Sequence, residues 1–199
     1  MNRLAIGLSA SLFCLCVGAA HATTIRYAAT LSGANEYPAN SSPATGFTTV
    51  LIDDDTNTMT VNATFSGLTA PTTASHIHCC TAVPFEGKAG VATALPTFPA
   101  FPLGVTSGSY TETFDLLSPS TYNAGFVTSN GGSVDSARLA FLAGLASDRA
   151  YLNIHTTAFP AGEIQGFLTE VPEPGSIALF GLGMIGLAAL RRRRGIVRV

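Results

Sequence analysis

Residues 59–65 read MTVNATF; every second residue is apolar, and the residues between are threonine or asparagine. Such alternation has the period of a β-strand with one buried face. Residues 25–31 (IRYAATL) and 47–52 (FTTVLI) are rich in threonine and β-branched residues, which favour strands. Residues 53–57 (DDDTN) precede the alternating stretch and supply the short polar side chains of a tight turn, so the sequence predicts a β-hairpin here.

The rest of the central region continues the pattern of short strands separated by turns. We expect strands at residues 74–78, 110–116, 150–155 and 163–168, and one short helix over residues 134–147. Many short strands with few helices are typical of two packed antiparallel sheets. The predicted fold class is all-β, an antiparallel β-sandwich similar to those of immunoglobulin-like and Cu/Zn-superoxide-dismutase-like domains.

Both ends of the chain carry export and membrane signals. Residues 1–22 have a cationic tip at Arg3, an apolar run and small residues up to Ala22, which predict a signal peptide cleaved after Ala22. An N-terminal membrane anchor is the alternative. Apolar residues 177–190 predict a transmembrane helix that holds the chain outside the cytoplasm, because the arginines that follow resist transfer through hydrocarbon. These are Arg191, Arg192, Arg193 and Arg194.

The segment before that helix contains Pro172, Glu173 and Pro174. A Pro-Glu-Pro motif, a short transmembrane helix and an Arg-rich tip together resemble the PEP-CTERM sorting signal. In that family an exosortase-type membrane enzyme recognises and cleaves the signal, and the substrates reach the surface of bacteria that make exopolysaccharide. The resemblance implies that residues 171–199 form a sorting signal. It also implies an exosortase-type partner, a membrane anchor before processing, and a final location on the cell surface or outside the cell.

The central region, residues 23–170, is acidic. It holds four basic and eleven acidic residues, a net charge of −7, whereas the whole chain carries −2. Nucleic-acid binding needs a clustered basic face, which four scattered cations cannot supply. Nucleic acid is therefore excluded as a partner.

Four stretches of the central region resemble the motifs of the CHRD domain, in the same order. They are residues 29–38 (ATLSGANEYP), 74–78 (ASHIH), 151–156 (YLNIHT) and 162–166 (GEIQG). The resemblance spans about residues 23–170 and implies a secreted β domain. We expect this domain to have a non-catalytic binding or structural role, with exopolysaccharide or surface proteins as partners. The chain departs from the usual pattern at its Cys-Cys pair and at a Pro-rich insertion.

Three histidines remain once the signal peptide is removed. His76 and His78 point to the same side of a strand, because successive side chains alternate between faces. If the strand containing His155 runs beside them, all three imidazoles converge, a composition suited to copper or zinc. The His-x-His pattern resembles Cu/Zn superoxide dismutase, although a two-metal centre needs more histidines. The alternative is structural: the histidines bond to backbone or carboxylate groups, and Glu163 pairs with one of them.

The adjacent Cys79 and Cys80 would lie outside the cytoplasm, where disulfides persist. Three alternatives stay open: a disulfide between them, a mixed His/Cys metal site, and a disulfide to another copy of the chain. Catalytic motifs are missing from the sequence, with no Gly-x-Ser-x-Gly, phosphate-binding loop or His-Glu-x-x-His, so we do not expect an enzyme. The Pro-rich residues 95–103 either cover the core or form a docking surface.

Overall fold

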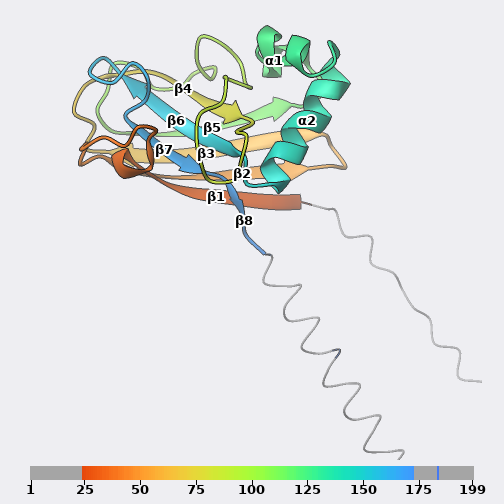
Figure 1. Cartoon of the computed structure of the whole chain (residues 1–199), viewed down its shortest axis with the longest axis horizontal. Helices are drawn as coiled ribbons and strands as arrows, with labels where there is room; N and C mark the ends of the chain where they lie inside the picture. The colour runs from red at the N-terminus through yellow and green to blue at the C-terminus, as the bar shows by residue number, and fades with distance from the viewer. Residues whose placement is uncertain (1–23, 173–182, 184–199) are drawn as a thin grey trace, which may run out of the picture.

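The computed structural model of the chain describes residues 24–172 and residue 183, and its body is built of antiparallel strands (Figure 1). Each strand predicted from the sequence is present. The strands are β1 (Thr24–Ser32), β2 (Thr45–Asp53), β3 (Thr58–Ser66), β4 (Thr72–Cys79), β5 (Gly108–Asp115), β6 (Ala150–Thr156), β7 (Ile164–Phe167) and the short β8 (Thr169–Glu170).

The strands follow one hydrogen-bonded path in the order β4-β6-β7-β1-β2-β3-β5, and β8 pairs with β1. The strands β1, β2, β3 and β5 are paired along most of their length, and so are β4, β6 and β7. Among the described residues, β1 and β7 join the two groups through one strand pair, Ser32 with Gln165. At this narrow joint the sheet curls, so that β4 and β6 lie across β2 and β3 (Figure 1). The all-β antiparallel fold class is confirmed.

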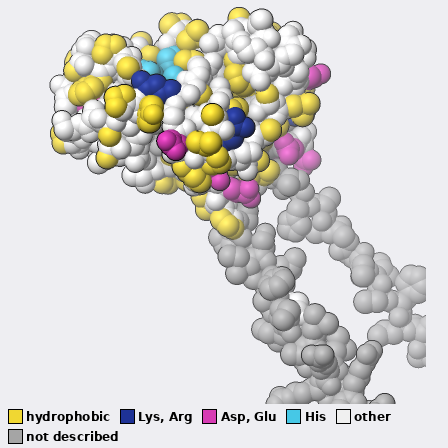
Figure 2. Space-filling model, in the orientation of Figure 1, with side chains coloured by type: hydrophobic (Ala, Val, Ile, Leu, Met, Phe, Trp, Pro, Cys, Tyr) yellow, Lys and Arg dark blue, Asp and Glu magenta, His cyan; other side chains and the backbone are white. Residues whose placement is uncertain are grey.

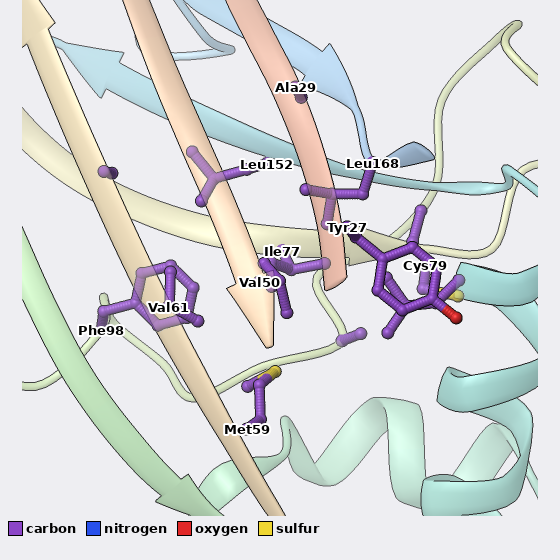
Figure 3. Close-up of a cluster of buried hydrophobic side chains, with 14 of the residues drawn as sticks. Tyr27, Ala29, Val50, Met59, Val61, Ile77, Cys79, Phe98, Leu152 and Leu168 are labelled. Atoms are coloured by element: carbon purple, nitrogen blue, oxygen red, sulfur yellow. The ribbon is translucent and has the colours of Figure 1, made fainter. Parts of the chain in front are cut away.

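The hydrophobic core fills the space inside the curl. Val50 and Val61 point inwards from β2 and β3, and Ile77 and Leu152 meet them from β4 and β6 (Figure 3). All four side chains are fully buried. The alternation in residues 59–65 is what places Val61 and its apolar neighbours on this face. Burial of apolar side chains from both layers, worth about 1.5–3 kcal/mol for each large one, holds the curl closed.

The helical part differs from the prediction of one helix. α2 (Val134–Ala146) matches the expected segment and begins with a capping box between Ser133 and Ser136. A second helix, α1 (Ala124–Ser129), was not predicted; its six residues are too few to show a helical period. Two 3-10 turns, η1 (Gly33–Asn35) and η2 (Pro119–Thr121), complete the helical elements of the described residues.

The Pro-rich segment, residues 95–103, covers the core. Its aromatic side chains are buried, with Phe98 stacked on Tyr110 and Phe101 stacked on Phe65. The backbone N–H of Phe98 donates to the carbonyl of Ser75 at 3.0 Å, which attaches the segment to β4. Of the two alternatives, the structure therefore supports the core cover.

Candidate metal centre

The pairing of β4 with β6 brings the three histidines together. In this register His76 lies opposite Asn153, His78 opposite Tyr151, and Ala74 opposite His155. Residues directly opposite each other point to the same side of an antiparallel pair, so the three imidazoles share one face. Each histidine is at most 9% exposed. Histidine side chains still reach the surface in Figure 2, where they form a small patch beside a cationic side chain.

Each imidazole uses one ring nitrogen to donate to a backbone carbonyl of a loop. His76 Nε2 bonds to Pro96 at 2.7 Å, His78 Nδ1 to Ala89 at 2.9 Å, and His155 Nδ1 to Pro160 at 3.0 Å. A carbonyl oxygen only accepts, so the bonded nitrogen must carry the proton. The tautomer of each ring is fixed by this bond, and the other nitrogen keeps its lone pair.

These remaining nitrogens are buried and have no hydrogen-bond partner. They are Nδ1 of His76, Nε2 of His78 and Nε2 of His155. Ligand nitrogens of the three residues lie within 4.8 Å of one another. A tetrahedral zinc ion at about 2.0–2.1 Å from each nitrogen would hold them about 3.4 Å apart, so the rings would have to move closer together on binding. The arrangement has the donor set of a three-histidine metal site.

Burial keeps the three imidazoles neutral at pH 7. It lowers the pKa of His78 to about 4 and of His155 to about 4, because the protonated ring loses solvation. Burial also lowers the pKa of His76. Neutral imidazole is the form that binds a metal ion, so no proton has to be displaced first.

The rings are also held by aromatic packing. His78 stacks on Tyr151 with ring centroids 4.9 Å apart and planes 4° from parallel, and His76 meets His155 edge-on at 5.3 Å. The Tyr151 hydroxyl accepts from the N–H of Ala89, the residue whose carbonyl holds His78. The site is therefore organised before any ligand arrives.

Glu163 does not pair with a histidine, so that part of the structural alternative is wrong. Its buried carboxylate accepts hydrogen bonds from Ser42 Oγ at 2.7 Å, Thr69 N–H at 2.7 Å and Thr156 Oγ at 2.6 Å. Burial alone would raise the pKa of Glu163, but the hydrogen bonds from Thr156, Thr69 and Ser42 outweigh it and lower that pKa. The carboxylate ties three separate segments together.

Two polar residues next to the cluster were not singled out from the sequence. Asn153 Oδ1 and Glu36 Oε1 are buried without a partner, and both approach Gly162, where a Cβ would collide with them. Burial raises the pKa of Glu36 to about 7, against smaller lowering effects from Lys88 and Asn153. The alternation that aligns Asn153 with His155 is visible in the sequence. The contact of Asn153 with Glu36, 117 positions away in the sequence, is not.

The structure joins Cys79 and Cys80 by a disulfide at the end of β4. The peptide bond between them is cis, with Cα atoms 3.0 Å apart. Their sulfur atoms pack against Gly144 of α2, where any side chain would collide with both. In this form neither sulfur can serve as a thiolate beside His78, nor bond to another copy of the chain.

The predicted sorting and export segments lie almost wholly outside the described residues. Pro172 is described and exposed. Glu173, Pro174, Arg191, Arg192, Arg193 and Arg194 are not, nor are residues 1–22 or most of the apolar segment 177–190. Among the described residues, no helix has the length and apolar character to span a membrane.

The fold and the histidine cluster define a small antiparallel β domain with a preformed polar site on one face. Residues 27–168 match the family model of the CHRD domain, and residues 170–194 match that of the PEP-CTERM protein-sorting motif. The chain therefore belongs to the CHRD domain family and carries a C-terminal sorting motif. Together these matches indicate an exosortase-sorted extracellular protein, and the motif implies export and processing at the membrane. No curated protein and no solved structure matches the chain.

Proposed function

We propose that the chain is displayed outside the cell after exosortase processing, where its CHRD domain acts as a non-catalytic binding module. The main support is that a CHRD match over residues 27–168 is followed directly by the sorting motif over residues 170–194. The face of β4 and β6 that bears the histidines is the proposed binding face, since unpartnered buried polar atoms gather there. Exopolysaccharide and surface proteins are the proposed partners of the displayed domain.

A non-catalytic role is supported by how two of the carboxylates are used. Asp53 accepts the N–H of Thr56 in the β2–β3 turn, and Glu163 holds three segments together. Both carboxylates therefore have structural roles. The sequence also lacks the nucleophile and metalloprotease motifs named above.

The sorting part of the proposal is tested in the producing cell with an antibody against the β domain. One variant replaces Pro172, Glu173 and Pro174 with alanine, and another replaces Arg191, Arg192, Arg193 and Arg194 with glutamine. We expect the wild-type chain to lose its C-terminal segment and to become accessible to added protease. Both variants should stay in the membrane fraction and keep their C-terminal segment.

A matched control replaces Asp54, Asp55 and Thr56 with alanine, three exposed residues of the β2–β3 turn. This control should be processed like the wild type. Wild-type chain recovered from the cytosol with both ends intact would refute the proposal.

A further inference from the structure

We infer that His76, His78 and His155 form a binding site for one divalent transition metal ion, with one coordination position left open to solvent. This inference rests on the proposed role of the domain as a binding module and names its ligand. It is carried by the three buried lone pairs on the β4–β6 face and by the loops that orient them.

Each histidine of the cluster has one buried ring nitrogen that presents a lone pair and has no donor. One ring nitrogen of each residue lies within 4.8 Å of one from each of the other two. A buried acceptor without a partner costs about 1–3 kcal/mol. One bridging water has only two O–H groups and so satisfies two of the three nitrogens. A single metal ion accepts all three lone pairs at once.

Backbone carbonyls hold the three rings in place. Ala89 and Pro96 in the β4–β5 connection and Pro160 in the β6–β7 connection each place one carbonyl against one imidazole. His76 is held through Nε2 and the other two through Nδ1, and in each case the other ring nitrogen is buried without a partner. A ring N–H bonded to a carbonyl is the usual outer shell of a metal-binding histidine, because it fixes both tautomer and orientation.

The ligand atoms indicate the kind of ion. The described cluster offers three neutral nitrogens and neither a carboxylate nor a thiolate. Calcium and magnesium prefer oxygen ligands, whereas imidazole suits zinc and copper, and copper binds more tightly than zinc to a given set of nitrogens. Three protein ligands leave a tetrahedral ion with one position for water or a small ligand. The site therefore takes Cu²⁺ in preference to Zn²⁺.

The test uses the full exported chain, purified from the surface or membrane fraction and freed of metal with a chelator. Cu²⁺, Zn²⁺ and Ca²⁺ are titrated separately by calorimetry, and bound metal is counted by elemental analysis. We expect one Cu²⁺ or one Zn²⁺ per chain, with tighter binding of Cu²⁺, and no binding of Ca²⁺. The electron paramagnetic resonance spectrum of the Cu²⁺ form should show hyperfine coupling to imidazole nitrogen.

The variants are chosen to keep the carbonyl bonds while removing the ligands. An asparagine amide occupies nearly the place of Nδ1 and a glutamine amide that of Nε2, so the set is His76→Gln, His78→Asn and His155→Asn. Outer-shell changes alone cost 10–100-fold in metal affinity, so each single variant should lose at least about 100-fold. A matched control, Asn62→Ala on β3, should bind like the wild type, because Asn62 lies on the other layer.

Copper binding of the wild type is measured without any variant, so a folding failure of one variant does not spoil the test. The inference is overturned if the wild type binds neither Cu²⁺ nor Zn²⁺ stoichiometrically. It is also overturned if variants that keep the far-ultraviolet circular dichroism of the wild type bind metal equally well. Neither result bears on the processing and surface accessibility of the chain, because these are measured separately.

Discussion

Acidification of the metal-free domain from pH 7.5 to 5.0 should destabilise it through the histidine cluster. His78 and His155 have pKa values of about 4 in the folded chain, against 6.5 for an ordinary histidine. Their stabilising contribution is complete above pH 6.5 and is lost as the pH falls towards 4, because only the unfolded chain takes up the protons. This difference in proton uptake lowers the free energy of unfolding at pH 5.0 by about 2 kcal/mol for each histidine and by about 4 kcal/mol for the pair.

Glu36 acts in the opposite direction. Its pKa is raised by burial to about 7 from 4.5, so its contribution is complete below pH 4.5 and is lost as the pH rises through 7. Through this residue, acidification to pH 5.0 raises the free energy of unfolding by about 2.4 kcal/mol. The free energy of unfolding of the wild-type chain should therefore fall by about 2 kcal/mol in total. His76 adds to this fall, because burial lowers its pKa too.

The measurement is urea unfolding followed by far-ultraviolet circular dichroism at both pH values, with a chelator present. Glu36→Gln should roughly double the pH-dependent loss of unfolding free energy, to about 4 kcal/mol. His78→Asn should reduce the loss by about 2 kcal/mol. The reasoning is refuted if the wild type is as stable at pH 5.0 as at 7.5, or if Glu36→Gln leaves the difference unchanged.

Three further predictions concern stability away from the cluster. Glu163→Leu should lower the free energy of unfolding by about 3–5 kcal/mol, because three donors lose their acceptor. Urea unfolding compared with Glu170→Leu, at an exposed site on β8, checks this. Gly144→Ala should cost about 1–3 kcal/mol through collision with the disulfide, and an unchanged thermal midpoint would contradict this contact. Ala100→Gly should raise stability by about 0.5–1 kcal/mol, because Ala100 has a φ of 57°; a lower thermal midpoint would contradict it.

The strands were predictable because their signal is local. In residues 59–65 the alternation alone identifies the face that β3 buries, and the same rule aligned His76 with His78. The convergence of His155 needed one more assumption, that its strand pairs with theirs, and the register of β4 and β6 bears that assumption out. For these elements, period-two geometry was sufficient.

What escaped prediction depends on contacts between distant segments. No periodicity reveals that carbonyls at Ala89, Pro96 and Pro160 hold the imidazoles, because such bonds depend on how loops fold back over the sheet. The same is true of Glu163, whose proximity in sequence to His155 suggested an ion pair. Its actual partners Ser42 and Thr69 lie about a hundred positions away in the sequence.

The pairing of β8 with β1 decides how the domain is presented to its surroundings. Tyr27 lies opposite Glu170, so the two ends of the β domain leave it close together, at the lower edge of Figure 1. Histidine side chains emerge on the upper surface in the same orientation (Figure 2). A tether attached beyond Glu170 would thus hold the body by its lower edge, opposite the surface where the histidine side chains emerge.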